Sequence, residues 1–392
     1  MTTKVAIASC HDKYNYGSLL QAYATEKAIE RLGCDVITID KRGLGKVIGA
    51  GRRKYYKENL FNLSMYKAKL GFVKHRVKHL TDRDFGEKMA ERNNAFASFA
   101  EREFSLSPRF STFEELGEYC ADFNSVVVGS DQLWLPVNIA GDYFTLSFVP
   151  EGVRKVAYAT SFGVSTLNDV YLARAAEFLA TFSAISVREI TGASLVKRAG
   201  RDADVVCDPT MLLCKDEWGA LTRGSCAVPP EPYVFCYFLG KNAWNRDCAK
   251  RLAKLTGCKV LAISHLDEYV GYDDDFADVQ PYDIDPFQWV ELLANARYVC
   301  TDSFHASVFS CLFEKQFFTF RRHEGMGTQS TNSRLDTLLG KMGLLGRLCE
   351  SEADFDQIAE DEIDFINTRK LLSDYRAESL DWLRRALEAD AS

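Results

Sequence analysis

Short runs of apolar residues alternate along the chain with longer segments in which apolar residues recur at helical spacing. This alternation is typical of a parallel β-sheet wrapped by α-helices. In the first part of the chain, the pattern predicts helices at 19–32, 92–104, 167–182 and from residue 192. It predicts strands at 4–9, 36–40, 125–131, 155–161, 184–187 and 205–209.

Three closely spaced prolines, Pro229, Pro230 and Pro232, precede a second series of the same kind. This series has predicted strands at 233–239, 259–263, 298–301 and 317–320, and predicted helices at 245–255, 286–294 and 304–313. We therefore expect an α/β protein with two Rossmann-like parallel-sheet domains that face a cleft. The expected parts are residues 1–214, a linker region at 215–232, residues 233–350 and an acidic helical tail at 351–392.

The composition is that of a globular protein, with 47% hydrophobic and 26% charged residues in 392. No apolar run approaches the length that a bilayer requires, and the N-terminus lacks a signal-peptide pattern, so we expect a cytoplasmic protein. The twelve cysteines are scattered through apolar segments without the spacing of metal ligands. We interpret them as reduced core residues and expect no metal.

The charge is unevenly distributed. The whole chain carries a net charge of −7, yet the segment 41–83 holds 13 Lys and Arg against two acids. A basic insertion in an acidic protein usually faces an anionic partner. Three roles are open for this segment: it could bind a membrane surface, cover the cleft as a lid, or form a solvated arm with scattered charges. We expect no nucleic-acid partner.

Polar residues that follow the predicted strands are the candidates for a site, because ligands of open parallel sheets bind beyond the carboxyl ends of the strands. Five such segments stand out, at 15–18, 129–134, 158–163, 186–189 and 301–305. Their candidate residues are Asn15, Tyr16, Gly17, Ser18, Gly129, Ser130, Asp131, Gln132, Trp134, Ser161, Arg188, Ser303 and His305.

Four of these motifs, in this order, resemble those of the polysaccharide pyruvyl transferase family. They are Asn-Tyr-Gly-Ser at 15–18, Gly-Ser-Asp-Gln-Leu-Trp at 129–134, Ser-Val-Arg-Glu at 186–189 and Thr-Asp-Ser-Phe-His at 301–305. The resemblance runs from about Lys4 to Leu345 and implies a GT-B-like fold. It also implies an enzyme that needs no cofactor and moves an enolpyruvyl-derived group from phosphoenolpyruvate to hydroxyls of a sugar, forming a pyruvate ketal.

The resemblance further implies a role in polysaccharide biosynthesis for the cell envelope. The acceptor would be a cell-surface polysaccharide, such as an exopolysaccharide, or its lipid-linked precursor. A lipid-linked acceptor would bring the enzyme to the inner face of the plasma membrane, with the basic insertion as the contact.

Arg188 is the candidate ligand of the donor. Phosphoenolpyruvate carries a carboxylate and a phosphate, and the planar guanidinium suits both groups. The resemblance implies this role for the arginine of the Ser-Val-Arg-Glu motif. The residues alone also permit a surface ion pair between Arg188 and Glu189.

His305 is the candidate acid–base residue. Ketal formation delivers a proton to the methylene carbon of the donor and removes one from the attacking hydroxyl, and histidine does both near neutral pH. It begins a predicted helix capped by Ser303, whose first N–H groups could hold phosphate oxygens. A hydrogen-bonded core histidine is the alternative.

Asp131, as a third catalytic candidate, could orient an acceptor hydroxyl, with Trp134 stacked on a sugar ring. The alternative is an aspartate that caps a turn above a packed tryptophan. The segment 15–17 is predicted to be a tight loop that lets a ligand approach the backbone.

One position departs from the family pattern. The better-characterised branch of the family has an arginine two residues before the histidine, where this chain has Ser303. Arg321, Arg322 and Arg334 are the candidate replacements, although a plain surface role is open for each, and Asn332 lies beside Arg334 in the same segment.

Two other functions stay open. A GT-B glycosyltransferase that uses a nucleotide sugar would need an acidic residue in the last loops, for which Glu324 is the candidate. A member of the family that binds glycan without turnover is the other, and Ser303 favours it. Release of phosphate from phosphoenolpyruvate would distinguish the three.

Overall fold

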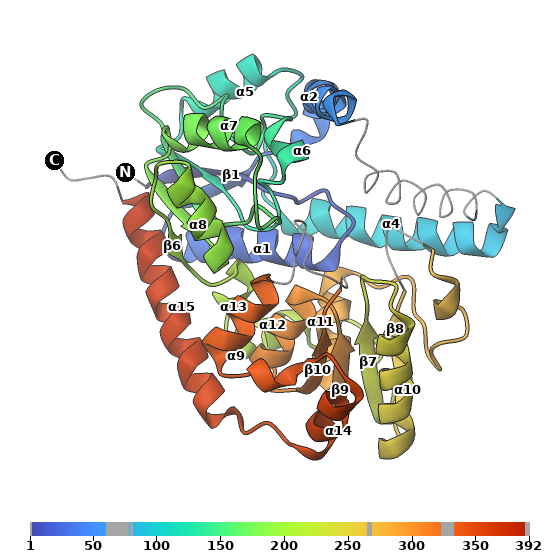
Figure 1. The fold of residues 1–392 in the computed structure, drawn as a ribbon. Coiled ribbons are helices and arrows are strands. Elements are labelled where there is room, and N and C mark those ends of the chain that lie inside the picture. Colours follow the sequence, from blue (N-terminus) through green and yellow to red (C-terminus); the bar gives the residue numbers. More distant parts are fainter. Residues whose placement is uncertain (1, 60–77, 79–80, 265–268, 323–332, 389–392) are drawn as a thin grey trace.

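The structure, a computed structural model, describes residues 2–59, 78, 81–264, 269–322 and 333–388. Its strands form two sheets, and every strand pair in them is parallel (Figure 1). The first sheet, in spatial order, is β2 (Asp35–Thr38), β1 (Lys4–Ala8), β3 (Ser125–Val128), β4 (Arg154–Thr160), β5 (Ala184–Val187) and β6 (Asp204–Val205). The second is β11 (Leu348–Cys349), β10 (Gln316–Phe320), β9 (Tyr298–Thr301), β7 (Tyr233–Tyr237) and β8 (Lys259–Ile263). The prediction of two parallel-sheet α/β units is confirmed.

Helices connect the strands in both halves, where the first half is the chain up to residue 222 and the second half runs from 233 to 349. The first half contains α1 (Tyr16–Arg31), α2 (Gly45–Glu58), α4 (Arg83–Glu103), α5 (Phe113–Cys120), α6 (Pro136–Ile139), α7 (Asp169–Leu179), α8 (Ile190–Arg198) and α9 (Lys215–Thr222), with 3-10 turns η1 (Lys41–Leu44) and η2 (Pro209–Met211). The second contains α10 (Ala243–Thr256), α11 (Pro286–Asn295), α12 (Phe304–Leu312) and α13 (Ser333–Met342), with η3 (Gly271–Asp273) and η4 (Leu345–Arg347). After it come α14 (Glu352–Glu360) and α15 (Phe365–Leu387).

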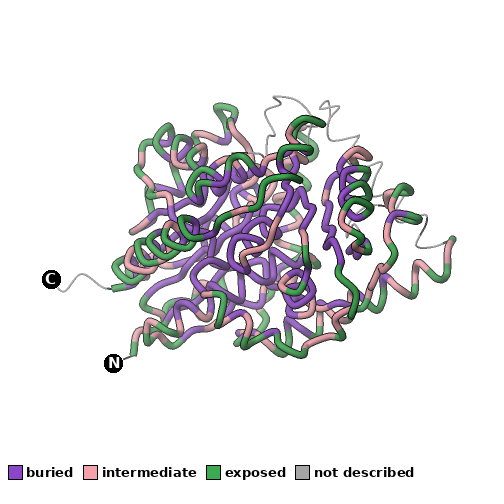
Figure 2. Tube along the Cα trace, turned by 90° about the horizontal axis from the view of Figure 1, so that it is seen from below, coloured by how far each residue is buried: buried purple, intermediate pink, exposed green. Residues whose placement is uncertain are grey.

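The two halves share one hydrophobic core. Successive side chains of a strand point to opposite faces of a sheet, so in β1 Val5 and Ile7 lie in the shared core while Ala6 and Ala8 lie in a core of the first half alone. The shared core also takes in residues of α1, α11 and α12. The buried residues accordingly run through the middle of the molecule without a break between the halves (Figure 2).

Helix α15 returns from the second half to the first (Figure 1). The Arg376 guanidinium donates to the Met211 carbonyl, the Trp382 indole N–H donates to Asp204, and the Ser379 hydroxyl accepts from the Cys207 N–H. Within the segment predicted as a tail, α15 therefore packs on the first half, whereas α14 packs in a core of the second half. The predicted linker likewise contains α9, whose Trp218 is fully buried.

Several predicted boundaries were wrong, and the beginning of α1 matters most. The helix begins at Tyr16 rather than at residue 19, because the Asn15 side chain accepts from the Ser18 N–H and so caps it. Glycine is a poor helix former, and Gly17 made the segment resemble a loop. Tyr16, Gly17 and Ser18 thus form the first turn of α1, and this turn lies at the carboxyl edge of the first sheet. At its other end the helix stops at Arg31, one residue before the predicted end at 32, and Gly33 follows with a left-handed φ of 84°.

Candidate active site

A cleft of about 200 Å³ opens where the two halves meet. Both halves contribute segments that follow strands, as expected for open parallel sheets. The first half lines the cleft with Lys13, Asn15, Ser18, Asp131 and Gln132, and the second half with Leu239, Ser303, Phe304, His305, Arg322 and Arg334. Eight of these were named as candidates from the sequence: Asn15, Ser18, Asp131, Gln132, Ser303, His305, Arg322 and Arg334.

Asp131 lies in the cleft in a strained backbone conformation. Its φ of 81° falls in the left-handed region, which is unusual for a residue with a side chain and concentrates at functional sites. One carboxylate oxygen accepts from the Ser18 hydroxyl at 2.6 Å and the other from Arg188 at 3.2 Å. Burial opposes ionisation, yet the charges of Lys13 and Arg188 hold the pKa of Asp131 well below its usual value.

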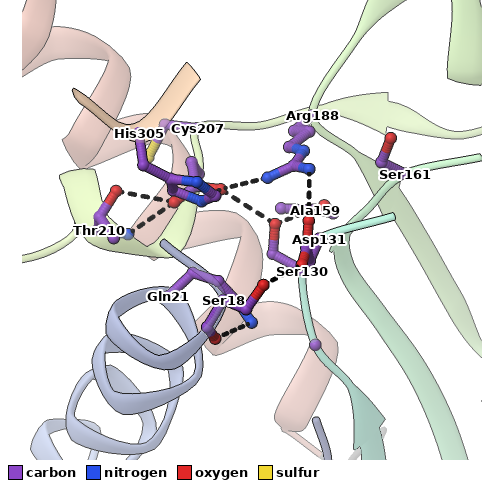
Figure 3. Close-up of polar contacts among 12 residues, drawn as sticks. Ser18, Gln21, Ser130, Asp131, Ala159, Ser161, Arg188, Cys207, Thr210 and His305 are labelled. Carbon is purple, nitrogen blue, oxygen red and sulfur yellow. Dashed lines mark hydrogen bonds and ion pairs between the residues drawn. The ribbon is translucent and has the colours of Figure 1, made fainter. Parts of the chain in front are cut away.

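Arg188 is buried behind Asp131 (Figure 3). Its guanidinium donates to Asp131 and, at 2.9 Å, to Asp208, and its Nε lies 3.9 Å from Glu189. A surface ion pair with Glu189 is therefore excluded. Burial by itself lowers the pKa of Arg188, but the carboxylates of Asp208 and Asp131 raise it above its usual value. Since Arg188 is absent from the cleft lining, the structure assigns it to holding the two aspartates rather than to direct contact with a donor.

Asp208 is a functional candidate that sequence reasoning missed. It is buried at the end of the segment that follows β6, and its carboxylate accepts from Arg188, Ser130 and Thr210 (Figure 3). Burial opposes ionisation here too, but His305 and Arg188 lower the pKa of Asp208. It lay inside the predicted strand at 205–209, whereas β6 ends at Val205 and leaves Asp208 in the segment after the strand, so a carboxylate near a strand end was the available signal.

His305 lies at the first turn of α12 and reaches the first half. Its Nε2 is 3.6 Å from an Asp208 oxygen, and only 7% of the residue is exposed. Ser303 caps the helix by accepting from the Ala306 N–H, as predicted. The neighbouring Asp302 accepts from the N–H groups of Leu239 and Gly240, which fixes the loop after β7 beside the cleft.

The cleft wall of the second half carries a buried arginine that has no counter-ion among the described residues. Arg334, on α13, is 95% buried, and among the described residues no carboxylate forms an ion pair with it. In the part of the chain that the structure describes, neither its Nε nor the Nε of Arg322 has a hydrogen-bond partner. Burial, together with Arg188 and Arg322, lowers the pKa of Arg334 to about 9. Such a site favours an anion, which would supply the missing partner.

Several predicted ligand contacts were wrong because the side chains are used by the fold. Trp134 is fully buried among Phe162, Phe178 and Phe182 and donates to the Phe144 carbonyl, so it cannot stack on a sugar. The packed tryptophan of the alternative interpretation is confirmed, but the Asp131 carboxylate accepts from Ser18 and Arg188 instead of capping a turn.

Four further predicted residues lie behind the cleft. Tyr16 stacks on Trp289 in the shared core and donates to the Ile284 carbonyl. Ser130 donates to Asp208 and Ser161 to Glu189, while the Gly129 N–H donates to the Ala8 carbonyl. These residues support the site without lining it. Asn332 and Glu324 lie outside the described residues.

The comparisons place this geometry in a known fold. The UDP-GlcNAc 2-epimerase of Neisseria meningitidis superimposes with a TM-score of 0.51 at 9% identity, covering 97% of this chain and 94% of the epimerase. Lower scores come from an alpha-glucosyltransferase (0.49, 8% identity, 98% and 95% covered) and from Acinetobacter baumannii MurG (0.43, 7% identity, 98% and 99% covered). No match was found among curated proteins.

The fold is thus that of the GT-B class, with two parallel-sheet units on either side of a cleft. The family model for polysaccharide pyruvyl transferase matches residues 15–324. The chain belongs to the polysaccharide pyruvyl transferase family.

Proposed function

We propose that this protein transfers a pyruvyl group from phosphoenolpyruvate to two hydroxyls of one sugar in a cell-surface polysaccharide or its lipid-linked precursor. The observation that carries the proposal is the buried Arg334, which has no ion-pair partner among the described residues, in the same cleft as His305 and Asp131. Phosphoenolpyruvate brings a carboxylate and a phosphate, so it matches the cationic wall formed by Arg322 and Arg334. The arginines take the place of the one that the family pattern has at Ser303.

The two walls of the cleft bind different substrates. The donor lies on the cationic wall, and an acceptor hydroxyl lies on the wall of Asp131, Asn15 and Ser18, whose oxygens accept hydrogen bonds from hydroxyls. One hydroxyl adds to the central carbon of the enol phosphate while the methylene carbon takes a proton and becomes a methyl group. The second hydroxyl then displaces the phosphate at the same carbon, and its proton leaves with the phosphate. His305, between the walls, moves the first proton.

The acceptor of a surface polysaccharide is often carried on a lipid, and the enzyme would meet it at the membrane. In the parts of the chain that the structure describes, no helix has the length and apolar character needed to cross a bilayer. We therefore propose contact at the membrane surface, through the basic insertion, rather than insertion into it.

The test is release of phosphate from phosphoenolpyruvate by the full chain in the presence of a glycan acceptor. His305→Ala should lower kcat by about 10² or more with little change in donor affinity, since general acid–base groups contribute on the order of 10² to 10⁴ in rate. Wild-type turnover retained in His305→Ala would refute the role of the histidine.

A wild type that binds no phosphoenolpyruvate would overturn the proposal as a whole. Hydrolysis of a nucleotide sugar would then indicate a glycosyltransferase, and retention of glycan without turnover of either donor would indicate a binding protein.

A further inference from the structure

Asp208 and Gly17 lie on two sides of the His305 ring, and neither is assigned a function by the family match. We propose that Asp208 is the positioning residue of His305: it keeps a proton on Nε2 and leaves Nδ1, beside Gly17, as the atom that exchanges protons with the substrates. This inference rests on the proposed function and deepens it.

Residues other than His305 hold the Asp208 carboxylate in place. One of its oxygens accepts from the Thr210 N–H at 3.1 Å and the Thr210 hydroxyl at 2.7 Å. The other accepts from Arg188 at 2.9 Å and Ser130 at 3.1 Å. A buried carboxylate held on both oxygens, by Thr210 and by Arg188, has one orientation, and its second oxygen is the one nearest to Nε2 of His305.

The Nε2 atom of His305 depends on this carboxylate. It is buried without a hydrogen-bond partner, and the Asp208 oxygen lies 3.6 Å away. Hydrogen bonds of catalytic groups are often long before substrate binds and shorten in the complex. A carboxylate accepts from an N–H and repels a lone pair, so Asp208 favours the tautomer that carries the proton on Nε2.

Gly17 explains how the other edge of the ring is accommodated. A Cβ at residue 17 would lie 2.0 Å from Nδ1 and 2.4 Å from Cγ of His305. The backbone of Gly17 is helical, so conformational freedom is not the reason for a glycine here. The prediction that Gly17 admits a ligand is corrected: the group it admits is the imidazole of His305.

The proton transfers then balance. Nδ1 accepts the proton of the attacking hydroxyl as the new C–O bond forms, and the resulting imidazolium, with Nε2–H facing Asp208, returns that proton to the methylene carbon. His305 is neutral before and after, and Asp208 stays ionised throughout. This is a role through position and charge, because Asp208 itself touches neither substrate.

The direct test is the tautomer of His305, read from ¹⁵N chemical shifts of histidine-labelled wild type at a pH where the ring is neutral. His305→Ala identifies the signal. We expect a protonated Nε2 and an unprotonated Nδ1 in the wild type, and loss of this preference in Asp208→Asn. A proton on Nδ1 in the wild type would overturn the inference whether or not phosphoenolpyruvate is the donor.

The kinetic test uses two variants on either side of the ring. Asp208→Asn and Gly17→Ala should each lower kcat by about 10² or more, with little change in KM for phosphoenolpyruvate. The controls are Asp40→Asn, a buried aspartate that accepts from Arg42 and Arg109 outside the cleft, and Gly340→Ala, where an added Cβ meets nothing within 4 Å. Both should keep the wild-type kcat.

If Asp208→Asn fails to fold, the kcat of Gly17→Ala and the tautomer of His305 in the wild type still test the proposed positioning of His305. Full activity in Gly17→Ala would contradict the placement of the reacting nitrogen. A wild type that shows the expected tautomer but never releases phosphate would instead refute the proposed function and leave the pairing of Asp208 with His305 intact.

Discussion

The Arg188 guanidinium of the first half lies 4.8 Å from the centre of the Phe304 ring, which belongs to the second half. The same ring has Arg334 at 5.8 Å. One aromatic side chain therefore contacts Arg188, which forms ion pairs with two aspartates, and Arg334, which has no ion-pair partner among the described residues. The difference between these two arginines determines what each should do when it is replaced.

Replacing Arg188 should mainly affect stability. Arg188→Ala would leave Asp131 and Asp208 buried without their shared partner, which costs about 3–5 kcal/mol for a broken buried pair. Arg188→Lys should recover only part of this, because a single ammonium cannot reproduce the two-pronged contact. Urea unfolding measures both. Arg251→Ala, which removes a partly exposed arginine paired with Glu352 and Asp356, is the control and should change stability far less. An Arg188→Ala protein as stable as the wild type would contradict the network.

Replacing Arg334 should have the opposite effect. Arg334→Met removes a buried charge that has no counter-ion among the described residues, so the Tm of the ligand-free protein should rise or stay the same. Phosphoenolpyruvate should raise the Tm of the wild type, since a ligand that binds only the folded state stabilises it. That shift should disappear in Arg334→Met.

Arg347 provides the matched control for this experiment. It is buried as deeply but donates to the carbonyls of Ile358 and Asp361, away from the cleft. Arg347→Met should lower the Tm and keep the response to phosphoenolpyruvate. An Arg334→Met protein that responds to the donor as the wild type does would remove Arg334 from the donor site.

The low pKa of Asp131 predicts a specific sensitivity to acid. Its pKa is depressed in the folded state, so its ionised form contributes stability that is complete above the unfolded value of about 3.9 and is lost as the pH falls below it. Asp131→Asn should therefore flatten the decline in unfolding free energy between about pH 5 and pH 3. Asparagine is the appropriate substitute because it tolerates the left-handed backbone at this position.

Urea unfolding at several pH values gives this curve. Asp356→Asn, at an exposed ion pair, serves as the control. A decline as steep in Asp131→Asn as in the wild type would show that the carboxylate does not carry the acid sensitivity.

The basic insertion should bind anionic membranes. Residues 60–77 and 79–80 of it lie outside the described residues, so this expectation rests on the 13 Lys and Arg between positions 41 and 83. Each basic residue near such a surface contributes about 1 kcal/mol of attraction. Flotation with anionic liposomes at low salt should recover the protein, and added salt should release it. Equal recovery with neutral liposomes would rule out an electrostatic contact.

The sequence was sufficient for every strand except β11 and for most of the residues that line the cleft. Strand β9 has the predicted bounds, and Ser303 and His305 follow it as expected, because apolar runs and a helix cap are local signals. The environment of Arg188 could not be predicted, since Asp131 and Asp208 reach it from distant parts of the chain. The role of Trp134 could not be predicted either. A tryptophan that follows a strand can stack on a sugar or pack in a core, and the tertiary packing that buries Trp134 is not visible in the local sequence.

The return of α15 to the first half has a consequence for how the chain folds during synthesis. The strands of the first sheet leave the ribosome early, but the helix that covers Asp204, Cys207 and Met211 is made after every strand of both sheets. The apolar surface of the first half that α15 covers in the folded protein therefore stays exposed until the second half has been translated. Asp208 lies within this late-covered segment, so the candidate catalytic centre is completed only by the final helix of the described chain.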